Sequence, residues 1–366
     1  MKKNLKHIII GSILGVVSVI LVITICVSSF FISDMNGGKK GKDIQIEIKS
    51  GTYTAQIAQI LEDKGIIDSA LGFRIFAKFN KYESQFKYGV YTFNTGDSYE
   101  EIAQKLMTQG AKAATIRVTI PEGTGINDYV KNVNGNNVTV LGIGSILEKA
   151  GVCTKADFIA AAKEYALEGK LLSGAKDKNT YYALEGYLYP DTYDFYKLDD
   201  SKEAAKLVIE PMVAQTNKKI TDDMYKKAEQ MGYSMHEILT MASIIQMESG
   251  VDTASLPKIA GVFYNRLNSN SFTTLGSSPT CYYGDSFEND DERYDTYKVK
   301  GLPPGPLCSP GIDAIKAALN PEGSDYYYFV TDKNGKFYFH KTLAEQNKTI
   351  NTLKQNGQWI YEYFNK

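Results

Sequence analysis

The spacing of apolar residues between residues 44 and 120 predicts a small module of strands and short helices. Ile44 to Ile48 alternates apolar and polar positions, as a half-buried strand does. Within residues 52–64, apolar side chains recur at helical spacing and Gly65 follows them. The same reasoning predicts helices at 71–79 and 99–107 and strands at 88–93 and 115–120. Strands that flank short helices are typical of an α+β fold.

Helical patterns dominate the chain from residue 201 onward. The predicted helices span residues 203–215, with a kink expected at Pro211, then 221–231, 234–250, 256–267, 310–320 and a last one from 342. Residues 326–330 and 337–340, joined through Asn334-Gly335, predict a β-hairpin. The acidic, tyrosine-rich residues 281–300 predict a loop. Residues 121–165 are less regular, with helices expected at 145–150 and 155–164.

The helix that begins after Ser234 places a carboxylate at the edge of an apolar face. Ser234 and Glu237 have the spacing of a capping box, and Gly250 is a typical helix stop. The apolar face consists of Ile238, Met241, Ala242 and Ile245. At about 100° per residue, Glu248 falls at the edge of that face.

The position of Glu248 suits a general acid. An ionised carboxylate beside apolar surface is costly unless it is paired. Burial and the negative end of a helix dipole both favour the protonated form of a carboxyl group. A carboxyl group that is protonated near neutral pH is what general acid catalysis requires. Spacing alone leaves a second interpretation open, a helix-end glutamate turned to solvent or paired with Lys or Arg.

The N-terminal run from Ile8 to Ile32 is apolar and uncharged. It is long enough to cross a bilayer with some tilt. Lys2, Lys3 and Lys6 precede it and favour a cytoplasmic N-terminus. The run ends without a small-residue cleavage site, so we expect an uncleaved transmembrane helix, with a cleaved signal peptide as the alternative.

These patterns predict the order of the domains. We expect a tail and transmembrane anchor at 1–33, a linker at 34–43, the α+β module at 44–120 and a helix-rich domain with a β-hairpin at 121–366. The linker is rich in Gly and Lys and spans at most roughly 35 Å when extended. We therefore expect a single-pass membrane protein whose body lies outside the cytoplasm, with its first domain close to the membrane.

Composition excludes several classes of function. The formal net charge is −1, which gives no electrostatic case for nucleic-acid binding. The chain has three His residues and no CxxC spacing, so neither a metal site nor a cofactor is expected. Cys153, Cys281 and Cys308 lie outside the apolar run, and both a Cys281–Cys308 disulfide and free thiols remain open.

Tyrosine is abundant, with 26 residues, and many of them fall in turn-rich segments. These are Tyr187, Tyr189, Tyr193, Tyr282, Tyr283, Tyr294 and Tyr297. Exposed rings with polar neighbours suit the flat faces of sugars, whereas half-buried surface tyrosines are the ordinary alternative. The proline-rich segment 301–306 predicts a rigid loop, which either walls a site or turns the chain.

Six sequence blocks occur in a characteristic order between residues 180 and 350. They are residues 184–193, 241–249, 261–267, 279–280, 294–297 and 301–311. In this order they resemble the YceG-like (MltG) endolytic murein transglycosylases. In the same comparison the module at 44–120 resembles a LysM-like domain.

The resemblance implies a reaction and a catalytic residue. It implies cleavage of the bond between N-acetylmuramic acid and N-acetylglucosamine in nascent glycan strands, with a 1,6-anhydro product that ends strand growth. Glu248 closes the 241–249 block and is the implied catalytic residue. Gln246 stands where the family often has a second glutamate, which leaves Glu248 as the only carboxylate in the block. The implied partners are glycan strands, the membrane, cell-wall synthases and division or elongation proteins.

The resemblance also nominates substrate-binding residues. They are Glu185, Ser277, Thr280, Tyr294, Asp295 and Tyr297. For Glu185, Tyr294 and Tyr297 an equally open role is to anchor the loops in which they lie.

The chain departs from the family pattern at a few positions. Gly276 and Ser278 stand where members commonly have Gln and Asp, Asp295 stands where Asn is usual, and Gln346 stands where a late His is expected. Asp295 adds a carboxylate that would allow hydrolysis instead. A second hypothesis, from another class of function, is a weakly active or inactive glycan-binding scaffold of the cell-wall synthesis machinery.

Overall fold

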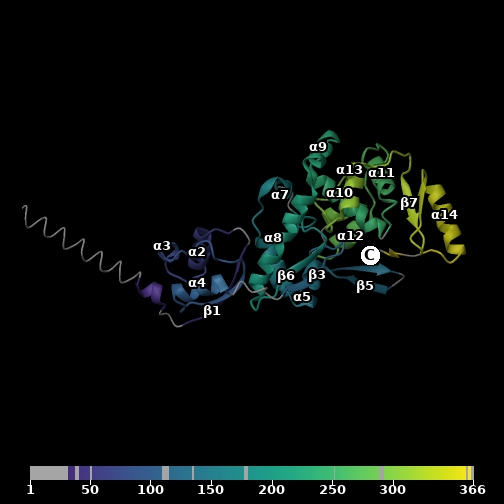
Figure 1. Cartoon of the computed structure of the whole chain (residues 1–366). Coiled ribbons are helices and arrows are strands. Elements are labelled where there is room, and N and C mark those ends of the chain that lie inside the picture. The colour runs from purple at the N-terminus through teal and green to yellow at the C-terminus, as the bar shows by residue number, and fades with distance from the viewer. Residues whose placement is uncertain are drawn as a thin grey trace, which may run out of the picture. The chain divides into compact units, whose positions relative to one another are not determined.

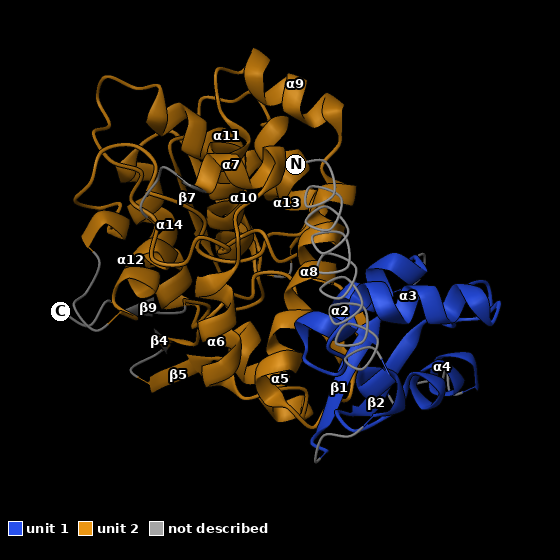
Figure 2. Ribbon diagram, turned by 90° about the vertical axis from the view of Figure 1, so that its left-hand side faces the viewer, with its two compact units in different colours: residues 1–115 blue, residues 116–366 orange. Residues whose placement is uncertain are grey.

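The computed structural model describes residues 32–37, 41–49, 52–108, 115–133, 136–176, 180–250, 252–287, 292–359 and 362–363. The chain forms two compact units, residues 1–115 (unit 1) and 116–366 (unit 2) (Figure 2). Each unit has its own arrangement of helices and strands (Figure 1). The domain boundaries expected from the sequence stay predictions.

Between residues 41 and 108, the described part of unit 1 consists of a pair of antiparallel strands and three helices. Strands β1 (Asp43–Ile48) and β2 (Gly89–Asn94) pair so that Asp43 lies opposite Asn94 and Ile48 opposite Gly89. The helices are α2 (Thr54–Asp63), α3 (Ala70–Phe79) and α4 (Tyr99–Thr108). All five elements match elements predicted from the apolar spacing to within a few residues.

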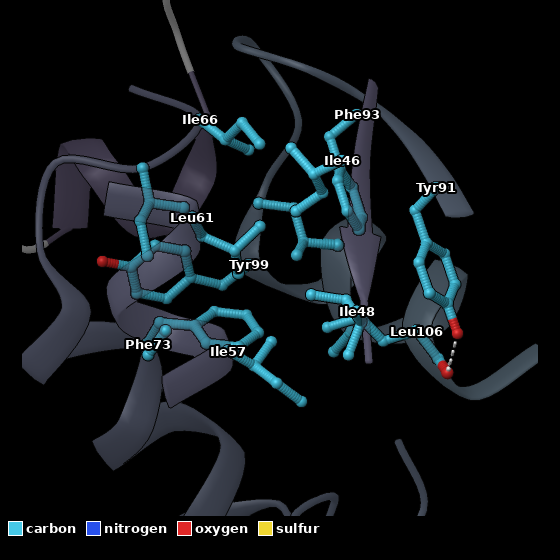
Figure 3. Packing of buried hydrophobic residues seen from close by; sticks show 14 of the residues in the cluster. Ile46, Ile48, Ile57, Leu61, Ile66, Phe73, Tyr91, Phe93, Tyr99 and Leu106 are labelled. Atoms are coloured by element: carbon cyan, nitrogen blue, oxygen red, sulfur yellow. Dashed lines mark hydrogen bonds between the residues drawn. The ribbon is translucent and has the colours of Figure 1, made fainter. Parts of the chain in front are cut away.

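A single apolar core joins these five elements (Figure 3). Ile48 comes from β1, Leu61 from α2, Phe73 from α3 and Leu106 from α4, and each is at most 2% exposed. The ring of Phe73 meets the ring of Tyr99 edge-on, with centroids 5.4 Å apart. The predicted helical stripe of α2 is therefore the face that packs into this core.

A helical turn at residues 32–36 is hydrogen-bonded to the rest of unit 1 through the side chain of Asp34. Asp34 Oδ1 accepts a hydrogen bond from the backbone N–H of Asp68 at 2.8 Å. Its other oxygen accepts from the hydroxyl of Tyr99, which also lies 3.1 Å from the carbonyl oxygen of Ser69. The turn is thereby held at the N-terminal end of α3.

The predicted fold class needs correction at its N-terminal element. Across the residues that the structure describes, no helix is both long and apolar enough to cross a membrane. The transmembrane helix expected at Ile8 to Ile32 is therefore not supported, and residues 8–31 lie outside the described part of the chain. What the structure supports is a mixed helix and sheet protein.

Unit 2 is built around helix α10 (Met235–Ser249). Figure 2 places α10 in the middle of the unit, where it contacts α7, α9, α11, α12 and α13. The helices of the unit are α5 (Ile143–Ala150), α6 (Lys155–Glu164), α7 (Gly169–Lys176), α8 (Ser201–Lys219), α9 (Asp222–Gln230), α11 (Leu256–Leu267), α12 (Ser278–Gly284), α13 (Ile312–Leu319) and α14 (Leu343–Gln355). Helix α8 runs on through Pro211.

The strands of unit 2 form small sheets around this helical centre. Strand β3 (Thr115–Thr119) pairs with β6 (Thr192–Tyr196), and β4 (Tyr129–Val133) lies between β5 (Asn136–Val140) and β9 (Glu362–Tyr363). Strands β7 (Tyr328–Thr331) and β8 (Phe337–His340) form the predicted hairpin, with Phe329 opposite Phe339.

Helix α10 is buried on almost all sides, not only along the predicted stripe. The capping box is present, because Ser234 Oγ accepts from the N–H of Glu237 and Glu237 accepts from the N–H of Ser234. Polar residues on the other faces bind a neighbouring segment. Ser243 Oγ accepts from the N–H of Leu307 at 3.0 Å, and Gln246 Oε1 accepts from the N–H of Gly311 at 3.0 Å. The segment 307–311 therefore runs along the C-terminal half of α10.

The predicted loop at 281–300 is wrong over its first residues. Helix α12 occupies Ser278–Gly284, and a 3-10 turn follows at Glu292–Tyr294. Almost every residue of α12 is buried, so the helix lacks the alternation of apolar and polar faces that reveals a helix in a sequence. Pro279 stands in its first turn, where proline is favoured. The sequence predicted neither the strands β4, β5 and β6 nor the helix α7.

Candidate functional site

Glu248 lies in the last turn of α10 with its side chain half-buried. The hydroxyl of Ser277 donates a hydrogen bond to Glu248 Oε1 at 2.6 Å. Ser277 itself has no exposed surface. Glu248 is therefore neither fully exposed nor fully enclosed, and one of its oxygens is held by a buried donor from a segment 29 residues away in the sequence.

A network of hydroxyl groups fixes Ser277. Its backbone N–H donates to Thr296 Oγ1 at 2.9 Å, and its carbonyl oxygen accepts from Thr280 Oγ1 at 2.6 Å. The two threonine hydroxyls are 2.8 Å apart. Because Ser277, Thr280 and Thr296 are all fully buried, their bonds hold the start of α12 in one position relative to Glu248.

Arg266, near the end of α11, supplies a positive charge beside this carboxylate. Burial lowers the pKa of Arg266, and the nearby Glu248 carboxylate opposes that shift. The guanidinium donates to the carbonyl oxygens of Leu275 and Gly276 on one side and to Tyr327 on the other, the last at 2.7 Å. Arg266 thus joins the segment that leads into Ser277 to the segment that leads into β7.

The most exposed ring of the site belongs to Tyr297, which is 50% exposed. Its hydroxyl lies 3.3 Å from Ser278 Oγ. The neighbouring Gly276 has a φ of +64°, a conformation that side-chain-bearing residues rarely adopt. A residue with a side chain, such as the Gln that the family resemblance led us to expect at this position, would strain the backbone found here.

Asp295 is engaged on its own side of the loop. Its Oδ1 accepts from the thiol of Cys281 at 3.1 Å and from the N–H of Tyr297 at 3.0 Å, and Lys298 lies 3.5 Å from its other oxygen. Burial acts to raise the pKa of Asp295, but these hydrogen bonds and the charge of Lys298 outweigh it and lower the pKa. Asp295 is therefore an ionised acceptor that links Cys281 of α12 to Tyr297 and Lys298.

Glu185 is a carboxyl group buried inside unit 2, where it is 1% exposed. Its oxygens accept from the N–H of Ile126 at 3.1 Å and from the hydroxyl of Tyr283 at 3.1 Å. Burial raises the pKa of Glu185 to about 8, although both donors act against the shift. Through Tyr283, Glu185 contacts α12, the helix whose N-cap is Ser277.

Most of the tyrosines expected to face sugar are buried instead. Tyr187, Tyr189, Tyr282, Tyr283 and Tyr294 are each at most 6% exposed. Tyr294 packs against Tyr283, with ring centroids 4.7 Å apart. The expectation of exposed rings in turn-rich segments is wrong for these five, because the segments around them fold inward.

The proline-rich loop packs at the other end of α10. The ring of His236 is held between the hydroxyl of Tyr187, 2.6 Å from Nδ1, and the carbonyl oxygen of Pro304, 2.7 Å from Nε2. Residues 301–304 line a groove with His236, Glu237 and Leu267. His236 is twelve positions before Glu248 on the helix, roughly 18 Å away. Residues 301–304 therefore border the N-terminal end of α10.

The three cysteines that the structure describes are free and buried. Burial raises the pKa of Cys153 and of Cys281 to about 12, and it raises the pKa of Cys308 well above the ordinary value of a thiol. Cys281 and Cys308 do not form a disulfide here, which decides between the two alternatives left open by the sequence.

Sequence reasoning missed two residues of the site, Arg266 and Thr296. Arg266 ends a helix whose other inward residues are apolar, and a cation in such a position signals a buried ionic or backbone contact. Thr296 offered no signal, since its hydroxyl acts only through contacts with Ser277 and Thr280 that folding creates.

Comparison with known proteins adds relatives to this geometry. The model of the YceG-like family matches residues 46–352. A protein of Bacillus subtilis named endolytic murein transglycosylase is 34% identical over 318 residues, which cover 83% of this chain and 83% of the relative. A Streptococcus pneumoniae protein of the same name is 29% identical over 84% of this chain, which spans 58% of that longer relative. The 2.6 Å crystal structure of a yceG-like protein from Listeria monocytogenes aligns with a TM-score of 0.51 and 31% identity, over 85% of this chain and all of that one.

Proposed function

Because this chain belongs to the YceG-like family, we propose that it is an endolytic murein transglycosylase, a carbon–oxygen lyase acting on peptidoglycan. The reaction breaks the bond between N-acetylmuramic acid and N-acetylglucosamine within a glycan strand. The observation that supports this most directly is the half-buried Glu248, held at the end of α10 by the Ser277 hydroxyl.

Glu248 acts first as an acid and then as a base in this proposal. Its carboxyl group gives a proton to the glycosidic oxygen as the bond to the muramic acid C1 breaks. The resulting carboxylate removes the proton from the C6 hydroxyl of the same muramic acid. That oxygen attacks C1 and closes a 1,6-anhydro ring, so the proton returns to Glu248 and no water is consumed.

Ser277 and Arg266 stabilise the carboxylate that appears between the two steps. A hydroxyl that donates to a carboxylate favours the charged form, and a cation nearby does the same. Both groups are fixed by hydrogen bonds before any substrate arrives, so no reorganisation is needed when the negative charge develops.

We assign different roles to the six residues nominated for substrate binding. Tyr297, the exposed ring beside Ser278, contacts sugar. Ser277, Thr280, Tyr294 and Glu185 are at most 1% exposed, so they position the site rather than touch the strand.

Asp295 shapes the loop from which Tyr297 projects. The bonds that occupy Asp295 favour ring closure over hydrolysis, because hydrolysis needs a second carboxylate free to activate water.

The proposed place of action is the cell wall, outside the cytoplasm. The substrate is nascent glycan strands, and cleavage within them ends their elongation. Unit 1 acts as a LysM-like module, and cell-wall synthases and division or elongation proteins are the proposed protein partners. The identity to relatives named endolytic murein transglycosylase supports the cell wall as the place of action.

The test is digestion of purified, uncross-linked glycan strands followed by mass spectrometry. We expect products with anhydro ends, which are one water lighter than reducing ends. Glu248→Gln lowers the rate by about a hundredfold or more. Glu229→Gln is the matched control, since Glu229 is an exposed carboxylate on α9.

Three results would contradict parts of the proposal. A wild-type protein that releases nothing is the glycan-binding scaffold instead. Products with reducing ends make it a hydrolase. If the Glu248→Gln variant is as active as the wild type, another residue is the general acid, and the assignment as an enzyme stands.

A further inference from the structure

Helix α3 in unit 1 presents an apolar and basic face to solvent. Leu71, Ile75 and Phe79 are 57%, 59% and 86% exposed. They are four residues apart, so they form one stripe along the helix. Arg74 and Lys78 are also exposed on this side, and α3 contains no acidic residue. Single exposed apolar residues are ordinary, but three in one stripe of a ten-residue helix mark a contact surface.

The stripe is not the side of α3 that the fold requires. The opposite side supplies Phe73 to the core of unit 1 (Figure 3), and Ala70 and Ala77 on that side are buried as well. The N-terminus of the helix is capped, because Ser69 Oγ accepts from the N–H of Gly72 at 3.0 Å. The apolar stripe therefore lies outside the core of unit 1. Its exposure to water costs free energy, and a partner that covered it would remove that cost.

More apolar surface lies at the N-terminal end of α3. The turn at 32–36 is fixed there through Asp34 and Asp68. Within this turn Ile32 is 53% exposed and Met35 is 36% exposed. The preceding residues 8–31 are uncharged and apolar in sequence. The chain thus enters unit 1 with an apolar sequence at the end of the helix that bears the stripe.

The charges on α3 select among possible occupants of this face. The segment 8–31 has no acidic residue to pair with Arg74 and Lys78. A second copy in a symmetric contact would bring these cations against their own counterparts. An anionic lipid surface accommodates both features, since the apolar side chains enter the acyl boundary and the cations meet phosphates. The nearest acidic residues in sequence, Asp68 and Glu83, lie beyond the two ends of the helix.

We propose that the Leu71–Arg74–Ile75–Lys78–Phe79 face of α3 docks on the surface of an anionic lipid bilayer. The contact is peripheral, because a ten-residue helix is about 15 Å long and the hydrocarbon core is roughly 30 Å thick. Helix α3 lies in the plane of the interface with its core side toward the rest of unit 1. The inference concerns unit 1 alone and does not depend on the catalytic assignment.

The test uses tryptophan fluorescence in the full chain. Trp359 is replaced by Phe, and a single tryptophan is introduced as Phe79→Trp or, as the matched control, Tyr88→Trp. Tyr88 is a 64% exposed aromatic that precedes β2 and is not part of the α3 face. Both proteins are reconstituted with vesicles of phosphatidylglycerol and phosphatidylcholine whose acyl chains are brominated. We expect blue-shifted, quenched emission from Phe79→Trp and unquenched emission from Tyr88→Trp.

Two further arms identify what covers the face. Replacing Arg74 or Lys78 by Gln reduces the equilibrium constant for docking by about fivefold for each cation. Vesicles without phosphatidylglycerol reduce the docking of the wild-type face as much as replacing both cations does. Equal quenching of the two tryptophans overturns the proposal. A blue shift of Phe79→Trp without vesicles also overturns it, because the face is then covered by protein. If that blue shift depends on protein concentration, the cover is a second copy; if it does not, the cover is a segment of the same chain.

Discussion

At the scale of single residues, the site is a carboxylate whose surroundings come from distant parts of the sequence. The apolar pattern drew attention to Glu248 but gave no partner for it. The structure provides Ser277 as a hydrogen-bond donor and Arg266 as a nearby cation. The family resemblance nominated Ser277 as a residue that binds substrate, whereas its buried hydroxyl donates to Glu248. A contact across 29 residues is a product of folding and leaves no local pattern.

Ser277→Ala tests the proposed positioning role. Loss of a hydrogen bond to a charged group lowers kcat by roughly tenfold to a hundredfold with little change in KM. Because the Ser277 hydroxyl favours the ionised carboxylate, its removal favours the acid form of Glu248. The alkaline side of the rate profile, where the acid form is lost, therefore moves to higher pH. The measurement is kcat and KM on glycan strands across pH.

The control for this change is Ser271→Ala, an exposed serine outside the site. A merely structural role for Ser277 would lower the amount of folded enzyme and leave the shape of the pH profile unchanged.

Glu185→Gln tests the buried carboxyl group through stability. Its pKa is about 8 in the folded chain against 4.5 for the ordinary side chain. Between pH 4.5 and pH 8 the folded state therefore keeps a proton on Glu185 that the unfolded state has lost. The contribution of Glu185 to the free energy of unfolding is complete below about pH 4.5 and is lost as the pH rises to about 8. The wild-type free energy of unfolding should fall by at most about 1.4 kcal/mol per pH unit from this group.

In Glu185→Gln this pH dependence disappears, while the amide oxygen can still accept from Ile126 and Tyr283. Urea unfolding at a series of pH values between 5 and 8 measures both slopes. Identical slopes in the two proteins would mean that Glu185 is ionised throughout.

At the scale of elements, regular amphipathic segments were predictable and fully buried ones were not. The helices of unit 1 follow their apolar spacing because each has one side in the core and one side outside, and the β7–β8 hairpin forms where its turn at Asn334-Gly335 predicted it. Helix α10 was predicted in place, but its polar residues are buried because they bind the segment 307–311. Helix α12 escaped prediction, since a short helix buried on all sides has no periodic signal.

Helix α11 connects the site to the hairpin, and Gly261 tests that connection. A Cβ at Gly261 would lie 2.2 Å from the carbonyl oxygen of Glu322, a backbone atom that cannot move aside easily. Gly261→Ala should lower the free energy of unfolding by about 1–3 kcal/mol. It should also lower activity, because α11 bears Arg266. Urea midpoints and rates on glycan strands measure the two effects.

Gly323→Ala is the matched control for this substitution. Nothing lies within 4 Å of a Cβ there, and Gly323 adjoins the same Glu322. If both variants were equally stable, the close approach of α11 to residue 322 would not be a packing constraint.

At the scale of the whole molecule, the chain is two units with separate cores. Composition and periodicity suggested a small module followed by a helix-rich domain. They also predicted a transmembrane helix, which the described part of the structure does not support. The arrangement of unit 2 around α10 was beyond sequence reasoning, because which helix becomes central depends on all its neighbours at once.

Phe73→Ala tests whether the cores are independent. Phe73 is fully buried in unit 1, so truncation should cost about 3–5 kcal/mol there. Hydrogen exchange should then show lost protection between residues 43 and 108 and unchanged protection beyond 116. Phe79→Ala, at an exposed position on the same helix, is the control and should leave protection unchanged. Lost protection throughout unit 2 would show that the two cores unfold together.

The attachment of Asp34 has a mechanical consequence. Tension along the chain at Ile32 passes through Asp34 to Tyr99 and to the start of α3, because these hydrogen bonds precede the glycine-rich stretch in sequence. A pull from the N-terminal side is therefore transmitted through Asp34 to the hydroxyl of Tyr99, whose ring lies in the core of unit 1.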